Sequence, residues 1–191
     1  MRIIKLTQFI ELLATKNRLA YCITSAYYRF LVKREAVLAN INEKDRVLCI
    51  GGGICPYTAI LLHRYTRAHV TVVDSNKRCV EEARKFISRK GYKNINVVLG
   101  KGEDLSYDGY TVIHLAMQIT PKELVLREVL SRAQEGTRVL IRKPKKGVER
   151  LYCRAAEEEK HFARCIKHSL FSNVDYTSVC IVDREAVGST I

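Results

Sequence analysis

Residues 46–62 read Arg-Val-Leu-Cys-Ile-Gly-Gly-Gly-Ile-Cys-Pro-Tyr-Thr-Ala-Ile-Leu-Leu, and this stretch decides the fold. An apolar strand ends at Ile50, three glycines follow at positions 51–53, and Pro56 then opens an amphipathic helix. Glycine has no Cβ, so its backbone takes positive φ and lets a ligand approach closely. The helix after the turn presents free N–H groups and the positive end of its dipole. This order of strand, glycine turn and helix is typical of a nucleotide-binding unit.

A second predicted strand ends on an acidic residue. Residues 69–73, His-Val-Thr-Val-Val, lead into Asp74, which lies 23 residues beyond Gly51. A carboxylate about 20 residues after the turn accepts hydrogen bonds from the two ribose hydroxyls of a nucleoside. The sequence therefore predicts a ligand with an adenosine-like group. The residues predicted to hold it here are Gly51, Gly52, Gly53, Asp74 and Ser75.

The glycine turn also discriminates between nucleoside cofactors. A dinucleotide fingerprint requires a glycine at its sixth position, where this chain has Pro56. A pyrophosphate would lose both the close helix packing and one N–H donor, because proline has none. A cofactor without phosphate fits better, and this favours S-adenosylmethionine, with its methionyl part along the glycine loop.

The composition is that of an ordinary globular domain. The chain has 191 residues, of which 47% are hydrophobic and 28% charged, so a single domain can bury a proper core. Residues 1–13 are apolar in places, but charged and polar side chains interrupt them, so neither a secretory segment nor a membrane span is predicted. We expect a cytoplasmic protein that does not enter a membrane. Seven cysteines without a Cys-x-x-Cys pair predict reduced thiols and no disulfide frame.

The formal net charge of +13 leaves two classes of partner open. Such a charge is typical of nucleic-acid binders, but it also occurs on a solvated surface around a site for a small molecule. The basic residues are dispersed apart from clusters at 85–90 and 142–146, and no RNA-reading motif with interleaved aromatic residues accompanies them. A small-molecule acceptor is therefore the first expectation, and RNA is the alternative.

A metal centre is not predicted. His161, Cys165 and His168 recur at helical spacing, which would align three ligands on one face of a predicted helix over 147–167. A fourth ligand and a Cys-x-x-Cys pair are missing from this pattern.

Strands and helices alternate along nearly the whole chain. Residues 7–39 carry apolar positions at helical spacing, so 1–45 are predicted to form an N-terminal helical cap and 46–191 a Rossmann-like domain that binds S-adenosylmethionine. The predicted fold class is α/β, with a doubly wound, mainly parallel seven-stranded sheet and an antiparallel last strand. Further strands are expected at 94–99, 110–115 and 138–141, and a closing antiparallel pair at 165–171 and 177–183. Ligands bind at the carboxyl ends of such strands, where Glu103, Asp104, Ala116 and Met117 are expected to complete the cofactor site.

From Arg46 to Asp183 the chain resembles the class I S-adenosylmethionine-dependent methyltransferases. It departs from their usual pattern at three places. Cys49 stands where an acidic residue normally precedes the first glycine, and Cys55 replaces a third glycine. Lys101 stands where an acidic residue often follows the third strand, with Glu103 and Asp104 just beyond it.

These departures resemble those of a narrower branch, the nicotianamine synthases. The turn Gly-Gly-Gly-Ile-Cys-Pro-Tyr-Thr at 51–58 is similar to their Gly-x-Gly-Pro-x-Pro-x-Thr pattern and adds Thr58 to the predicted cofactor site. Similar segments lie at 27–38, 147–152 and 176–179, together with Arg142. The resemblance implies transfer of the aminocarboxypropyl group of the cofactor to an amine. That family uses a larger N-terminal helical domain that supplies a catalytic glutamate, and only about 45 residues precede the first strand here.

Methyl transfer is therefore the first expectation, and aminocarboxypropyl transfer is the alternative. A third alternative is an RNA-modifying methyltransferase, and a fourth is a partner subunit that binds the cofactor without catalysis. Both transfers are displacements at a carbon attached to sulfonium, which require alignment of donor and acceptor and, for an ammonium acceptor, removal of a proton. The residues predicted to act at the acceptor are Tyr28, Glu35 and Arg142. Arg142 would either clamp a carboxylate or pair with a neighbouring acid. The sequence does not indicate whether the protein is a monomer or an oligomer.

Overall fold

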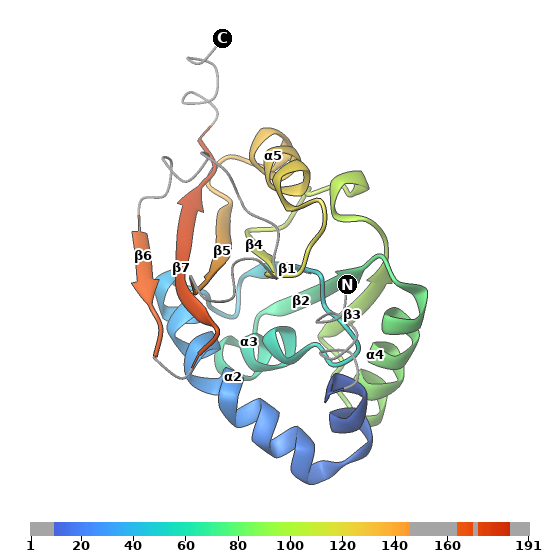
Figure 1. Ribbon diagram of the computed structural model, residues 1–191. Coiled ribbons are helices and arrows are strands. Elements are labelled where there is room, and N and C mark those ends of the chain that lie inside the picture. The colour runs from blue at the N-terminus through green and yellow to red at the C-terminus, as the bar shows by residue number, and fades with distance from the viewer. Residues whose placement is uncertain (1–9, 146–163, 170–171, 184–191) are drawn as a thin grey trace.

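The computed structural model describes residues 10–145, 164–169 and 172–183 (Figure 1). Its centre is a seven-stranded sheet in the order β3-β2-β1-β4-β5-β7-β6. The strands are β1 (Arg46–Ile50), β2 (His69–Asp74), β3 (Ile95–Leu99), β4 (Val112–Leu115), β5 (Arg138–Pro144), β6 (Arg164–Lys167) and β7 (Val174–Ile181). The helices are α2 (Arg18–Leu38), α3 (Tyr57–Thr66), α4 (Lys77–Arg89) and α5 (Lys122–Arg132), with a short 3₁₀ turn η1 (Gly102–Asp104) and a helical segment at 10–16.

The five strands from β3 to β5 run parallel, whereas β7 pairs antiparallel with both β5 and β6. The predicted fold class is therefore confirmed. The chain reverses direction across the sheet between β1 and β4, because β2 and β3 lie on one side of β1 and β4 and β5 on the other (Figure 1). In doubly wound sheets this switch point is where ligands bind.

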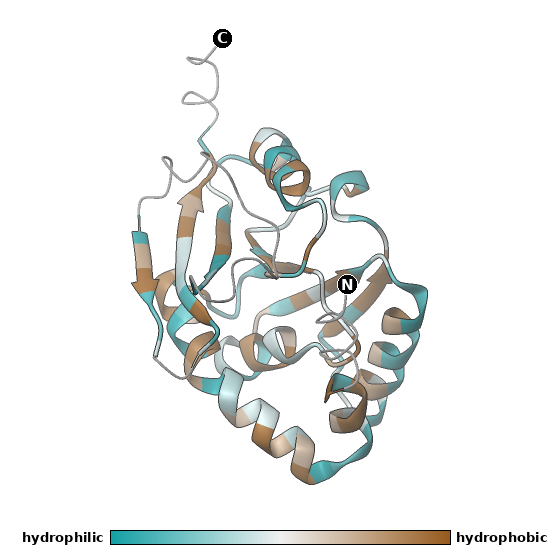
Figure 2. Ribbon diagram, viewed as in Figure 1, coloured by the Kyte–Doolittle hydropathy of each residue, from teal (hydrophilic) through white to brown (hydrophobic). Residues whose placement is uncertain are grey.

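Helices cover both faces of the sheet, which explains why its strands read as continuous apolar runs. In β1, Val47 and Cys49 belong to the core cluster shared with α2, α3 and α4, whereas Leu48 and Ile50 belong to the cluster shared with α5. Adjacent residues of a strand point to opposite faces, so both must be apolar when both faces are covered. Figure 2 shows hydrophobic residues gathered along these central strands.

The predicted closing pair of antiparallel strands is confirmed in β6 and β7, whereas the predicted helix over 147–167 is wrong at its end. Residues 164–167 form β6, in which Cys165 pairs with Ser178 of β7. The argument from helical spacing for a three-ligand face therefore fails at Cys165. His161 and the segment 147–152 lie outside the described residues. Within the described ranges, no group of His, Cys, Asp and Glu side chains is arranged to hold a metal ion.

The N-terminal helices lie against the α3 side of the sheet. Asn17 separates the segment 10–16 from α2, and its Oδ1 accepts hydrogen bonds from Leu19 N at 2.8 Å and Ala20 N at 3.2 Å. An asparagine at this position satisfies N–H groups that have no partner within the helix. Of the helices in the described ranges, none combines the length and the apolar character that crossing a membrane requires.

Candidate active site

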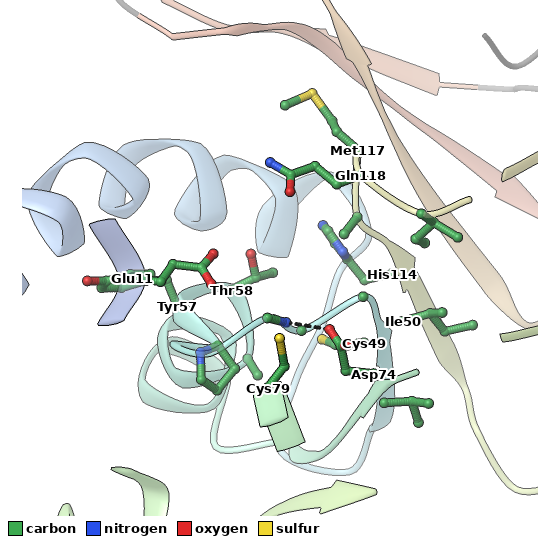
Figure 3. Close-up of a pocket in the computed structure, with 18 of the residues that line it drawn as sticks. Glu11, Cys49, Ile50, Tyr57, Thr58, Asp74, Cys79, His114, Met117 and Gln118 are labelled. Carbon is green, nitrogen blue, oxygen red and sulfur yellow. Dashed lines mark hydrogen bonds between the residues drawn. The ribbon is translucent and has the colours of Figure 1, made fainter. Parts of the chain in front are cut away.

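A cavity of about 680 Å³ lies at the carboxyl ends of β1, β2 and β4, and 18 of its lining residues are drawn in Figure 3. The structure brings most of the predicted site residues together here. Those that line the cavity are Gly51, Gly52, Gly53, Thr58, Asp74, Ser75, Glu103, Ala116, Met117, Tyr28 and Arg142. Two predicted residues, Asp104 and Glu35, do not line it.

The glycine loop is tied to β2 by its own backbone. Gly51 N and Gly52 N both donate to the carbonyl oxygen of Val73, at 2.8 and 3.2 Å. Gly51 has a φ of +84°, a conformation that other residues rarely adopt. A Cβ on Gly52 would lie 2.0 Å from Cγ1 of Val72, which is closer than any real contact. The loop therefore needs glycine at position 51 for its backbone conformation and at position 52 because a side chain would collide with Val72.

Asp74 ends β2 with its carboxylate turned back toward the loop. Its Oδ2 accepts the Gly53 N–H at 2.8 Å, the bond drawn dashed in Figure 3, and its Oδ1 accepts the Asn76 N–H at 2.9 Å. Each carboxylate oxygen keeps further acceptor capacity, so the group is fixed in place and still able to accept ribose hydroxyls. The residues present thus fit an adenosine-like ligand at this edge.

Glu11, a residue that the sequence did not single out, also reaches the glycine loop. It comes from the segment 10–16, and its Oε2 accepts the Ile54 N–H at 2.9 Å, close to where the chain enters α3. Burial, opposed by backbone hydrogen bonds and assisted by the nearby Asp74, raises the pKa of the Glu11 carboxyl to about 7. No local pattern could have identified this contact, because 43 residues separate its partners.

A buried ion pair lies behind the cavity wall. Arg142 of β5 donates from Nε and Nη2 to the two carboxylate oxygens of Glu35 on α2, each at 2.7 Å. Thr177 donates its hydroxyl to Glu35 Oε1 at 2.7 Å. Burial alone would raise the pKa of Glu35, but the bidentate Arg142 outweighs it and holds that pKa well below its ordinary value. Glu35 is fully buried, and its carboxylate is the counter-charge of Arg142 in this structure.

Aromatic side chains form the wall on the α2 side. The Tyr57 ring stacks between Tyr21 and Tyr28, with both pairs of ring centroids 5.5 Å apart. The guanidinium of Arg142 lies 6.0 Å from the centre of the Tyr28 ring. Tyr28, Tyr57 and Arg142 all line the cavity, and Tyr28 contacts both of the others.

His114 on β4 also lines the cavity (Figure 3). Its Nε2 lies 3.5 Å from Oε2 of Glu35. Burial, together with the positive charge of Arg142, lowers the pKa of His114, so the ring is neutral. The sequence indicated a strand residue at this position, and the structure adds that it belongs to the cavity.

Comparison with known proteins agrees with this geometry. Residues 47–136 match the family described as methyltransferase domain. A search of curated proteins found no match. Together with the strand order and the glycine turn, the match indicates a class I S-adenosylmethionine-dependent methyltransferase domain over residues 47–136. Such a domain is an enzyme domain, and its cofactor is S-adenosylmethionine.

Solved structures extend the likeness beyond that domain. MtNAS, a nicotianamine synthase-like protein solved in complex with MTA and tNA, is 26% identical, covers 92% of this chain and 69% of its own, and gives a TM-score of 0.76. A mutant of MtNAS in complex with S-adenosylmethionine is 24% identical over 94% of this chain and 73% of its own, with a TM-score of 0.79. An RNA methyltransferase from Salinibacter ruber, solved with S-adenosyl-L-homocysteine, is 16% identical over 81% of this chain and 91% of its own, with a TM-score of 0.66, and shows the fold alone.

Proposed function

We propose that this chain transfers an alkyl group of S-adenosylmethionine, in the first place its methyl group, to a small-molecule acceptor. The observation that carries this proposal is the position of the cavity. It opens from the glycine loop and Asp74, where the cofactor domain predicts the nucleoside, toward a wall made by Tyr28, Tyr57 and Arg142. Residues 1–45, proposed as a cap, contribute part of this wall.

The charges around the cavity support a small molecule over RNA. Phosphate recognition uses several exposed Lys and Arg side chains, whereas Arg142 is engaged by Glu35. Of the cluster at 142–146, Lys143 Nζ lies 5.3 Å from the centre of the Tyr176 ring, and Lys145 Nζ donates to Ser169 O. Lys146 lies outside the described residues. The likeness to an RNA methyltransferase concerns the fold and supports no acceptor.

Each part of the site has a task in such a transfer. The bound cofactor supplies an electrophilic carbon attached to sulfonium. Asp74 accepts ribose hydroxyls, and the loop at 51–53 holds the methionyl part by close backbone approach. The aromatic wall orients the acceptor, and this orientation is the main source of rate in a direct displacement. A carboxyl with a pKa near neutrality, as at Glu11, is suited to take a proton from an ammonium acceptor.

Glu11 also favours a second candidate, transfer of the aminocarboxypropyl group. The resembled family takes its catalytic glutamate from an N-terminal helical domain. Helical residues 10–16 of this chain bring a glutamate to the cavity. The likeness to MtNAS, solved with MTA and tNA, supports the same candidate.

The product left by the cofactor tests both reactions. Methyl transfer leaves S-adenosylhomocysteine, and aminocarboxypropyl transfer leaves methylthioadenosine. We would incubate the protein with S-adenosylmethionine and a metabolite extract and quantify both products by mass spectrometry. We expect product formation that depends on protein and extract and falls strongly in Asp74→Ala. If neither product forms above the protein-free rate, the transferase proposal is rejected.

A further inference from the structure

Two buried polar atoms in the described part of the chain lack a hydrogen-bond partner, and both belong to residues that line the cavity. They are the hydroxyl oxygen of Tyr57 and Nε2 of His114. Buried polar atoms are nearly always hydrogen-bonded, and an exception calls for a physical reason. One such reason is a partner supplied by a ligand. The coincidence of both atoms with one cavity is the basis of the inference.

Protein groups near His114 cannot complete its bonding. The nearest acceptor, Glu35 Oε2 at 3.5 Å, lacks hydrogen-bonding geometry with Nε2. The Glu35 carboxylate already accepts two bonds from Arg142 and one from Thr177. In the described part of the chain Nε2 is therefore without a hydrogen-bond partner, and it can donate to or accept from a ligand according to the tautomer of the ring.

Tyr57 is in a similar position. Its ring is fixed by stacking between Tyr21 and Tyr28. Thr24 and Cys55 are the polar neighbours of its hydroxyl, and neither reaches hydrogen-bonding geometry with it. Burial raises the pKa of the Tyr57 phenol above its ordinary range, so the hydroxyl keeps its proton. A neutral hydroxyl held by a rigid ring can both donate and accept a hydrogen bond.

Sheet order places His114 on the acceptor side. Asp74 ends β2 on one side of β1, whereas β4, which carries His114, lies on the other side next to β5 and Arg142. Tyr57 is connected to Arg142 through its stack with Tyr28, whose ring centre lies 6.0 Å from the guanidinium. The proposed function assigns Tyr57 to the acceptor wall, and β4 places His114 beside the strand that carries Arg142.

We propose that Tyr57 and His114 are specificity-determining residues that hydrogen-bond the acceptor, which is accordingly a polar molecule with at least two hydrogen-bonding groups and not a hydrocarbon. This inference rests on the proposed transferase function and narrows its acceptor. An acceptor lacking those groups would leave both protein atoms unpaired, and a site of this kind rejects such molecules strongly.

Two variants that keep an aromatic ring and remove its polar atoms, Tyr57→Phe and His114→Phe, test the inference. The matched control is Tyr107→Phe, because the Tyr107 hydroxyl is equally buried but donates to Gly102 O at 2.7 Å. We would measure the thermal midpoint of each ligand-free protein and its affinity for S-adenosylhomocysteine by calorimetry. We would also measure the initial rate of product formation at saturating S-adenosylmethionine with limiting metabolite extract.

We expect Tyr57→Phe to melt at or above the wild-type midpoint, since its hydroxyl has no protein hydrogen bond to lose, whereas Tyr107→Phe melts lower. Tyr57→Phe and His114→Phe should both bind S-adenosylhomocysteine within twofold of wild type and form product at least tenfold more slowly. A midpoint of Tyr57→Phe that falls as in Tyr107→Phe would overturn the inference, because the hydroxyl would then be structural. A tenfold loss of S-adenosylhomocysteine affinity would also overturn it, since the partner would be the cofactor. If both variants form product at the wild-type rate, the inference about Tyr57 and His114 is overturned but the transferase function stands. If the wild-type protein itself forms no product, the transferase function is rejected.

Discussion

Replacement of Glu35 by glutamine tests the part of the molecule that holds Arg142. The change keeps the size and shape of the side chain but leaves the Arg142 guanidinium, which is only 5% exposed, without a counter-charge. Breaking a buried pair by removing one partner destabilises a protein by about 3–5 kcal/mol. For a chain of this size, 1 kcal/mol shifts the midpoint by about 2–4 °C, so the thermal midpoint should fall by about 6–20 °C.

The matched control is Glu82→Gln. Glu82 accepts from Lys85 Nζ at 2.9 Å, but this pair lies on the surface of α4, where ion pairs contribute little. Circular dichroism would follow unfolding of both variants, with the double variant Glu35→Leu/Arg142→Met expected to recover most of the loss. The reasoning about the buried pair is refuted if the thermal midpoints of Glu35→Gln and Glu82→Gln differ by less than about 2 °C, which corresponds to about 1 kcal/mol or less.

The same pair has a pH signature. Because the folded pKa of Glu35 is lowered from its ordinary value of 4.5, its contribution to stability is complete above pH 4.5 and is lost as the pH falls below that value. The stability advantage of wild type over Glu35→Gln should therefore shrink on acidification. An advantage that grows toward acid pH would contradict the assignment of a lowered pKa.

Three further outcomes concern the cofactor edge. Asp74→Ala should weaken S-adenosylhomocysteine binding by roughly tenfold to a hundredfold in calorimetry, because a charge-assisted hydrogen bond contributes about 1.5–3 kcal/mol; unchanged binding by the folded variant rejects the site. Gly52→Ala should abolish that binding and lower the thermal midpoint, since the new Cβ would lie 2.0 Å from Cγ1 of Val72. Its control is Gly109→Ala, which has a φ of +74° and open space around it. This control should lose only about 1–2 kcal/mol of unfolding free energy and no affinity for S-adenosylhomocysteine. The pKa of the Glu11 carboxyl in the folded protein is raised from 4.5 to about 7. Its contribution to stability is therefore complete below pH 4.5 and is lost as the pH rises through 7. In pH-dependent melts, wild type should lose stability relative to Glu11→Gln over that interval.

Local sequence determined the fold and the cofactor edge to a large extent. The glycine turn and Asp74 could be predicted because each is set by a few neighbouring residues, and their contact at Gly53 follows from the parallel register of β1 and β2. The Glu35–Arg142 pair could not be predicted as a contact, because 107 residues separate its members. From the sequence alone, any acidic side chain or water could accept the hydrogen bonds of Arg142.

The predicted helix over 147–167 extended too far for a related physical reason. Residues 164–167 pair with β7, as expected for the closing strands, and this tertiary pairing outweighs the local helical spacing. Glu11 and His114 were not selected for the same reason. Each looks like an ordinary helix or strand residue until the sheet brings it to the cavity.

The burial of α2 is uneven along its length, and this has a mechanical consequence. Its last two turns enter the core through Leu31, Val32 and Glu35. Its first two turns are held mainly by Tyr21, whose ring stacks on Tyr57, whereas Leu19 and Ile23 are 69% and 64% exposed. A segment with fewer buried contacts opens locally at lower free energy. Amide hydrogen exchange should accordingly be faster before Tyr21 than after Leu31, and loss of the Tyr21–Tyr57 contact should release the start of α2 beside the cavity before the glycine loop opens.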